Sequence, residues 1–350
     1  MKLVALFLFV LLILVMAERA YSAKSLKVSE RVVPIPASVS IELQNSIRDM
    51  PAIARSKTPT NTAEWKLLQK QRNKERASNI TNIASALKVQ IKSKTVDGVP
   101  VFELTPATIK SENVQRTFLY LHGGAYVFGK ADAGLAEGLI IANRLNIPVL
   151  CVDYRMPPDA PFPAAIDDVV TVYQHLLESR PANSLIIGGT SAGGGLAFAA
   201  VHKMRQLKLE PPAAIYGGTP WVDLSKTGDT LFTHAGLDRI LGSYEGLLSA
   251  AALLYAGGKD LHNELVSPVY GEFENFPPAF LVTGTRDLFL SDVARIHRKL
   301  RASKVIADLH VFEGMSHADY LVVANSPESL EMYRELSVFV DTHLAAPGPD

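Results

Sequence analysis

From about Val99 onward, short β-rich runs alternate with longer helical stretches, and this alternation constrains the fold more than any other feature. Strands that alternate with helices predict a mainly parallel sheet covered by helices on both faces. The middle runs are continuously apolar, as expected of strands buried on both sides. The predicted strands are VPVFEL, RTFLYL, PVLCVDY, LIIGG, AAIYGG, AFLVTG and IADLHVF, and the predicted helices are Ala131–Asn146, Pro163–Ser179, Ala192–Leu207, Ser291–Ala302 and Pro327–His343.

Two segments interrupt this rhythm. Residues 24 to about 90 look mostly helical, with apolar residues at spacings of three to four, and residues 224–266 form a largely helical insert. We therefore expect an α/β core of residues 96–223 and 267–345. A helical cap would be built from residues 24–95 and 224–266, and residues 346–350 would be a frayed tail.

The N-terminus has the layout of a targeting segment. Lys2 precedes an apolar run, Leu3–Ala17, and several small residues follow it. This pattern is typical of a secretory signal peptide over residues 1–23. The run is shorter than the roughly 20 residues of a spanning helix, although an uncleaved anchor remains the alternative. We expect an exported protein, periplasmic or secreted, or one held at a membrane by this segment alone.

Composition excludes several classes of partner. Lysine and arginine number 35 and aspartate and glutamate 35, so no overall field favours nucleic acid. Cys151 is the only cysteine, so an intrachain disulfide is excluded. The sequence has no Cys/His cluster with ligand spacing, and we expect neither a metal nor an organic cofactor. Asn79 begins an NIT sequon, a glycosylation acceptor only in a host with that machinery.

One serine stands inside a cluster of glycines. Gly189-Thr190-Ser191-Ala192-Gly193 follows an apolar strand and opens an alanine-rich helix, which is the setting of a nucleophile elbow. In such a turn the serine backbone is strained and its neighbours must be small, and the helix N-terminus favours negative charge. The alternative is a glycine-rich helix start that packs closely on the sheet. A phosphate loop would need a lysine after the glycines, and none follows.

A second glycine loop precedes this serine in the chain. His122-Gly123-Gly124-Ala125 follows the strand RTFLYL, where backbone amides without large side chains can approach a substrate oxygen. Taken alone, the loop is equally well explained as a glycine turn that ends a strand. Paired with Ser191, it predicts an oxyanion hole.

A serine nucleophile needs a base and an acid, which follow it in this type of fold in the order Asp or Glu, then His. His317 lies on a loop just after a strand, whereas His297, His310 and His343 lie within predicted helices or a strand. Asp287 falls just past the carboxyl end of a strand, where ligand-facing groups gather. Asp292 is the rival acid, and we expect it instead to complement the dipole of the next helix.

Several ordered motifs carry a family resemblance. HGGA, GTSAGG, DYRMPPDAPFPAAIDD, GTPWVDLS and FPPAFLVTGTRDLFLSD resemble the hormone-sensitive lipase family of α/β-hydrolases, the bacterial family IV esterases, in its GTSAG branch, over roughly residues 95–345. The resemblance implies a serine carboxylesterase acting on short- to medium-chain acyl esters, and it also points to Asp287. It implies that the amides of Gly124, Ala125 and Ala192 donate to the oxyanion, with Gly123 as a substitute.

The resemblance leaves some points open. Ala125 stands where the family usually has a third glycine, so the hole is in doubt if that residue must adopt a positive φ. Dimers are common in such families, which leaves a homodimer open. An amidase or peptidase could use the same Ser191–His317–Asp287 triad. A ligand-binding receptor on this fold, like the plant gibberellin receptors, would lack the histidine, and a membrane-anchored interaction protein would not need the triad.

Overall fold

The computed structural model describes residues 30, 32–49 and 57–345. The chain divides into two compact units, residues 1–34 and 35–350, and the features below belong to the second. The predicted signal peptide or anchor, residues 1–23, and the predicted tail, residues 346–350, lie outside the described residues. Among the helices that the structure does describe, none combines the length and the apolar character needed to cross a membrane.

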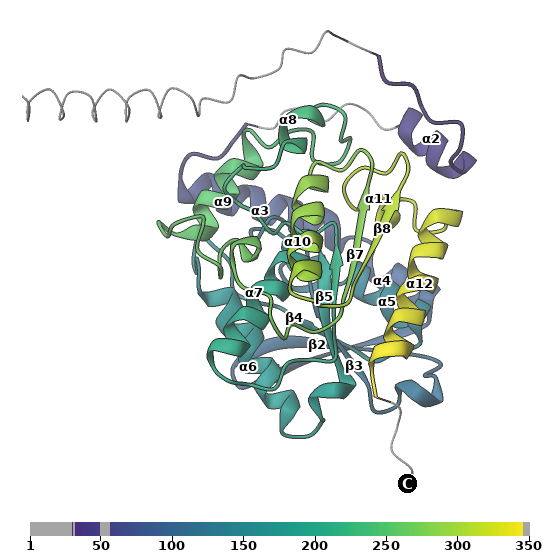
Figure 1. The fold of residues 1–350 in the computed structure, drawn as a ribbon, viewed down its shortest axis with the longest axis vertical. Coiled ribbons are helices and arrows are strands. Elements are labelled where there is room, and N and C mark those ends of the chain that lie inside the picture. The colour runs from purple at the N-terminus through teal and green to yellow at the C-terminus, as the bar shows by residue number, and fades with distance from the viewer. Residues whose placement is uncertain (1–29, 31, 50–56, 346–350) are drawn as a thin grey trace, which may run out of the picture. The chain divides into compact units, whose positions relative to one another are not determined.

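The centre of the fold is one eight-stranded sheet with the order β1-β2-β4-β3-β5-β6-β7-β8 (Figure 1). The β1–β2 and β2–β4 pairs are antiparallel, and all pairs from β4 to β8 are parallel. The predicted α/β fold with a mostly parallel sheet is therefore confirmed. The strands are β1 Val89–Val96, β2 Val99–Pro106, β3 Thr117–Leu121, β4 Val149–Val152, β5 Leu185–Thr190, β6 Ala214–Gly218, β7 Ala279–Gly284 and β8 Ala307–Phe312.

Helices cover both faces of the sheet because each buries an apolar stripe against it. Two apolar clusters result, one on each face, and β5 supplies Leu185 and Ile187 to one and Ile186 to the other. The first cluster includes residues of α6 Ala164–Leu177, α7 Ala192–Gln206 and α10 Leu290–Ala302. The second includes residues of α4 Ile80–Leu87, α5 Ala136–Leu145 and α12 Pro327–His343.

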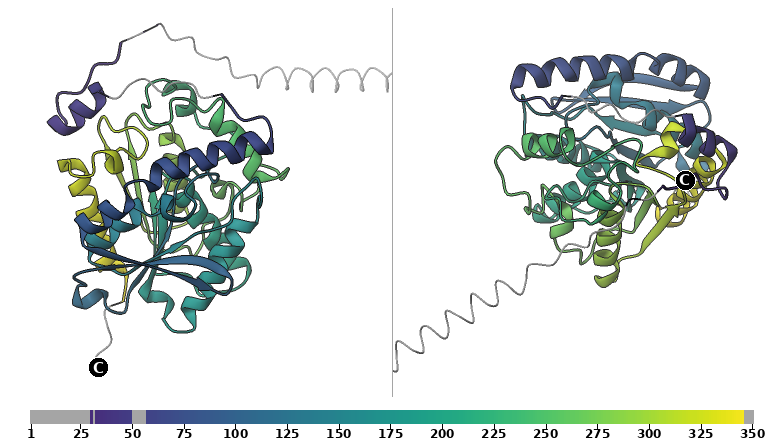
Figure 2. Two further views of the ribbon diagram at one scale, coloured as in Figure 1. Left: turned by 180° about the vertical axis from the view of Figure 1, so that it is seen from behind. Right: turned by 90° about the horizontal axis from the view of Figure 1, so that it is seen from above.

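The predicted helical segment of residues 24–95 is corrected at its end. It contains α2 Ile41–Asp49, α3 Thr62–Ala77 and α4, but Val89–Val96 form the edge strand β1 (Figure 2). Pairing with β2 provides this strand's hydrogen bonds, and only its two end residues are buried. Its solvated side chains give no apolar alternation. The turn Asp97-Gly98, with positive φ at both residues, was the available signal for a hairpin.

The insert of residues 224–266 is less helical than predicted. It contains α8 Thr230–Thr233 and α9 Leu247–Ala256, and most of the remainder is turns. The other short elements are 3₁₀ turns and one helical turn. They are η1 Ser111–Asn113, η2 Ala131–Gly134, η3 Ala182–Ser184, η4 Pro268–Tyr270 and α11 Asp319–Val322.

Two residues of α3 allow a test of whether this N-terminal helix packs as part of the core. Trp65 is 4% exposed and belongs to the first cluster, whereas Leu67 on the same helix is 69% exposed. We expect Trp65→Ala to lower the free energy of unfolding by about 3–5 kcal/mol, because it leaves a large cavity. Leu67→Ala should change it by less than about 0.5 kcal/mol. Urea unfolding measures both, and equal effects would contradict the packing.

Candidate active site

Ser191 lies at the turn between β5 and α7 with φ 63° and ψ −124°, the strained conformation that the elbow interpretation predicts. Its amide donates to the carbonyl of Gly218 (2.8 Å), and its carbonyl accepts from the amide of Trp221 (3.0 Å). These bonds tie the turn to the end of β6. Strain of this kind persists only where the surroundings over-determine it, and it concentrates at functional sites.

The glycines on either side of Ser191 allow a close approach of backbone to backbone. A Cβ on Gly189 would lie 1.8 Å from the carbonyl oxygen of Leu121, and one on Gly193 would lie 1.9 Å from the same atom. The turn therefore packs directly on the end of β3. This contact also brings Gly123 beside the serine, since a Cβ on Gly123 would lie 3.3 Å from Ser191 Cβ.

The loop after β3 has three consecutive residues with positive φ: Gly124 (128°), Ala125 (54°) and Tyr126 (62°). Ala125 thus adopts a left-handed conformation, at a cost of roughly 1–2 kcal/mol. A positive φ at this residue is the condition under which the family resemblance left the oxyanion hole in doubt. Within the described chain, the amides of Gly124 and Ala125 donate no hydrogen bond, so they remain available to a ligand. Ala192 begins α7, where first-turn amides have no intrahelical acceptor.

The loop is braced from two directions. Tyr154 donates to the His122 carbonyl (2.7 Å), and the two rings stack with centroids 4.1 Å apart. Burial lowers the pKa of His122 to about 4, so the ring is neutral at pH 7 and acts as packing. From α3, Gln69 donates to the Val127 carbonyl (2.7 Å), and Asn73 accepts from the Gly129 amide (2.9 Å).

The structure brings the predicted base and acid together. His317 Nδ1 lies 3.1 Å from Asp287 Oδ1, and both side chains are almost fully buried. Asp287 also accepts from the Thr283 hydroxyl (2.8 Å) and the Phe289 amide (2.9 Å), which orient its carboxylate. The Phe289 ring meets the imidazole edge-on at 4.9 Å. A proton on Nδ1 leaves the lone pair of Nε2 available.

The hydrogen bond expected between Ser191 and His317 is not formed. In the described part of the chain, Ser191 Oγ forms no hydrogen bond, with His317 or any other group. Such contacts are often long in the absence of substrate and tighten when it binds. Ser191 and His317 nevertheless follow β5 and β8, which run parallel, so both lie at the carboxyl edge of the sheet.

The rival acid, Asp292, lies in a different environment. Its Oδ2 accepts from the Asp223 amide (3.1 Å), and its Oδ1 has no partner among the described residues. Burial and the nearby Asp223 raise the pKa of Asp292 well above its usual range. Burial therefore opposes the negative charge that we expected at the start of this helix. Asp223 itself forms an ion pair with Arg295.

Asp238, an insert residue that was not predicted from the sequence, binds both loops of the site. Its Oδ2 accepts from the amides of Leu288 (2.8 Å) and His317 (3.3 Å), and its Oδ1 accepts from Ile240 and Leu241. Burial and the charge of Asp287 raise the pKa of Asp238. No local pattern marks this residue, because its partners are 50 and 79 positions away.

The next residue, Arg239, extends this connection to the N-terminal segment. Its guanidinium pairs with Asp319 (2.5 Å) and donates to the Ser46 carbonyl at the same distance. Its backbone amide donates to the Ser316 hydroxyl (3.2 Å). Arg239 therefore links the insert to both the loop that carries His317 and α2.

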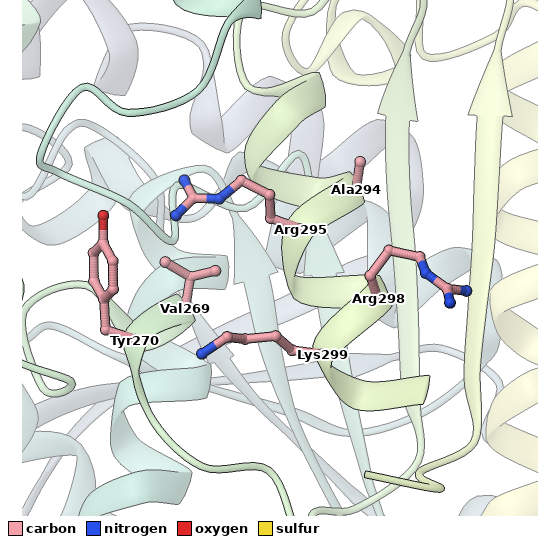
Figure 3. A pocket seen from close by; sticks show the side chains of 6 residues that line it. All are labelled: Val269, Tyr270, Ala294, Arg295, Arg298 and Lys299. Carbon is pink, nitrogen blue, oxygen red and sulfur yellow. The ribbon is translucent and has the colours of Figure 1, made fainter. Parts of the chain in front are cut away.

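A cavity of about 350 Å³ lies between η4 and α10 (Figure 3). Its lining residues are Val269, Tyr270, Ala294, Arg295, Arg298 and Lys299. Arg295 is engaged by Asp223, and Lys299 Nζ lies 3.4 Å from the Gly271 carbonyl. None of the predicted site residues lines the cavity. In the described residues, no group of three or more His, Cys, Asp or Glu could hold a metal ion.

Comparison with known proteins identifies hydrolases as relatives of this chain. Residues 118–321 match the model of a family with the alpha/beta hydrolase fold. A putative acetyl-hydrolase, LipR, of Mycobacterium tuberculosis is 32% identical over 253 residues, covering 71% of this chain and 80% of LipR. An acetyl-hydrolase of Streptomyces hygroscopicus is 33% identical over 184 residues, 52% of this chain and 61% of that protein.

Solved structures agree with these relatives. The crystal structure of esterase E25 superposes with a TM-score of 0.89 and 40% identity, covering 92% of this chain and 99% of E25. An esterase from the bacterial hormone-sensitive lipase family has a TM-score of 0.69 and 28% identity, covering 82% of this chain and 100% of that protein.

Asp238 offers a test of how the insert supports the site. We expect Asp238→Asn to lower the free energy of unfolding by about 1–3 kcal/mol, because an amide would face backbone N–H groups with its own N–H. The kcat for ester hydrolysis should fall about tenfold or more, as both loops lose a shared anchor. Thermal melts and steady-state kinetics measure these effects.

Asp260→Asn is the matched control, since the exposed Asp260 accepts a backbone amide from His262 (3.0 Å) in a similar turn. It should leave kcat unchanged. If Asp238→Asn behaved like this control, the insert would not support the loops as described.

Proposed function

This chain belongs to the hormone-sensitive lipase family of α/β-hydrolases and is an esterase, and on that premise we propose that Ser191, His317 and Asp287 are its catalytic triad. The observation that carries the proposal is the buried hydrogen bond of 3.1 Å between His317 and Asp287. The strained elbow at Ser191 lies at the same edge of the sheet and supports the third member.

In the proposed first step, Ser191 Oγ attacks the acyl carbonyl carbon while His317 Nε2 takes the hydroxyl proton. Asp287 accepts the hydrogen bond from Nδ1–H, which keeps the imidazole in the required tautomer and stabilises the imidazolium. The Thr283 hydroxyl and the Phe289 amide hold the carboxylate for this task. The proton carried on Nε2 then passes to the leaving alcohol.

The carbonyl oxygen becomes an oxyanion in this step and needs donors already in place. We propose the amides of Gly124, Ala125 and Ala192 for this role, with Gly123 in the same loop as a substitute. Their availability in the described chain and the contact between Gly123 and Ser191 support this assignment. Water then attacks the acyl-enzyme with His317 as base, which releases the acid and restores Ser191.

We propose short- to medium-chain acyl esters as substrates. Two of the relatives bear the name acetyl-hydrolase. Large aromatic side chains pack beside the proposed nucleophile. Trp221, whose amide binds the Ser191 carbonyl, stacks on Phe289 with ring centroids 5.3 Å apart, and both rings are fully buried.

A series of p-nitrophenyl esters tests the substrate class. We expect kcat/KM to be highest between acetate and octanoate and to fall at least tenfold at palmitate, because a site matched to short chains gains nothing from the further methylenes. Ser191→Ala should reduce hydrolysis of every ester by at least about 10³-fold. A maximum at palmitate would refute the chain-length proposal, and an active Ser191→Ala variant would refute the nucleophile.

The two candidate acids can be separated by isosteric amides. Asp287→Asn should lower kcat roughly 10³–10⁴-fold, because the imidazole loses its anionic partner. Asp292→Asn should change kcat by less than about twofold, since His317 bonds to Asp287 and an amide oxygen at position 292 can still accept from the Asp223 amide. Steady-state kinetics with p-nitrophenyl butyrate decide between them. A larger loss in Asp292→Asn would transfer the role of the acid to Asp292.

A further inference from the structure

Behind the serine lies a buried polar cluster that the proposed mechanism does not use. Glu137 on α5 accepts from the Thr190 hydroxyl (2.6 Å) and the Tyr216 hydroxyl (3.0 Å) through Oε1, and from Tyr120 (3.0 Å) through Oε2. The Tyr320 hydroxyl lies 2.6 Å from Thr190 Oγ1. All five side chains are nearly or fully buried. We call Glu137, Thr190, Tyr216 and Tyr320 the hydroxyl cluster.

The backbone leaves space for this cluster at one point. A Cβ on Gly218 would lie 2.1 Å from the Tyr320 oxygen, 2.4 Å from Thr190 Oγ1 and 2.5 Å from the Tyr216 oxygen. Any larger residue would therefore push the hydroxyls apart. The carbonyl of the same Gly218 accepts the hydrogen bond from the Ser191 amide. The cluster and the nucleophile turn thus share one backbone residue.

The available hydroxyl protons determine which group donates in each hydrogen bond of the cluster. Thr190 has a single hydroxyl proton, and Glu137 as a carboxylate can only accept, so Thr190 donates to Glu137. Tyr320 must then donate to Thr190. Burial raises the pKa of Glu137 to about 7, although the hydrogen bonds from Thr190, Tyr216 and Tyr120 lower it in part. The carboxyl of Glu137 therefore sets the orientation of the hydroxyls above it.

Two members of this chain of hydrogen bonds are close in sequence to the two proposed reacting groups. Thr190 immediately precedes Ser191, and Tyr320 stands three residues after His317 in α11. On the basis of the proposed function, we propose that Glu137 is a positioning residue that, through Thr190 and Tyr320, fixes the nucleophile turn relative to the loop of the base. Misplacement by about 1 Å can cost 10²-fold in rate.

Packing alone does not explain the cluster. A buried carboxyl is costly unless hydrogen bonds compensate for lost water, and an apolar residue of similar size would avoid that cost. Three members of the hydroxyl cluster lie in elements that adjoin the site: Thr190 ends β5, Tyr216 lies in β6, and Tyr320 lies in α11. Tyr333 packs edge-on against Tyr320 with ring centroids 6.3 Å apart, yet its hydroxyl has no partner in the described residues.

Two matched pairs of variants test the proposal. Thr190→Val removes the hydroxyl but keeps the shape, and Thr190→Ser keeps the hydroxyl. Tyr320→Phe removes a hydroxyl of the cluster, and Tyr333→Phe removes the unpartnered one. We expect kcat to fall roughly 10- to 100-fold in Thr190→Val and Tyr320→Phe, with KM within about twofold. Thr190→Ser and Tyr333→Phe should stay near the wild-type kcat.

Glu137→Gln completes the set, because the amide can accept only through one oxygen and should lower kcat about tenfold with KM unchanged. Steady-state kinetics on p-nitrophenyl butyrate and thermal melts are measured for every variant. Unchanged kcat in a folded Thr190→Val would overturn the proposal. So would equal losses in Tyr320→Phe and Tyr333→Phe that follow their melting temperatures, or losses confined to KM. If Tyr320→Phe does not fold, the Thr190 pair decides.

Ser191→Ala separates this proposal from the proposed function. If that variant is inactive, the function stands and the cluster variants judge the positioning role alone. If it retains activity, the proposed function fails, and the positioning role fails with it.

Discussion

The close contact between the turn at Ser191 and the Leu121 carbonyl is the constraint on which the site depends. Gly189 and Gly193 allow it, since a Cβ at either position would overlap that oxygen. The contact fixes the end of β3 against the end of β5, so the loop that begins at His122 must emerge beside the serine. One close approach of backbone to backbone therefore places neighbouring amides beside a serine whose backbone is strained. The sheet supplies the rigidity that maintains this approach.

The N-terminal helices and the insert of residues 224–266 support this arrangement. Helix α3 holds the loop after β3 through Gln69 and Asn73. The insert holds the loops of Asp287 and His317 through Asp238, and Arg239 connects them to α2. These bonds reach backbone groups in three separate loops. Parts of the chain that differ most from a regular α/β pattern thus determine how precisely the core presents its polar groups.

The sequence predicted the features that depend on local pattern. Continuous apolar runs identified the parallel strands, and glycine spacing with chain order identified Ser191, Asp287 and His317 as a possible set. Strand β1 was missed because its solvated edge has no apolar alternation. Asp238 and Glu137 were missed because their partners are distant in the chain. Burial, which a sequence does not display, raises the pKa of Asp292 and so opposes the charge that we expected there.

Ala125 has a consequence for how well the loop after β3 is ordered before a ligand arrives. A glycine there would occupy the left-handed region without strain, but it would also have access to many other conformations. Once the contacts of the loop impose a positive φ of 54°, the methyl group excludes most of these alternatives. The strained Ala125 therefore allows the backbone amides of this loop a narrower range of orientations. Ala125 therefore costs the loop some stability, but the loop loses less conformational entropy when a ligand binds. Such preorganisation would favour the binding of an oxyanion.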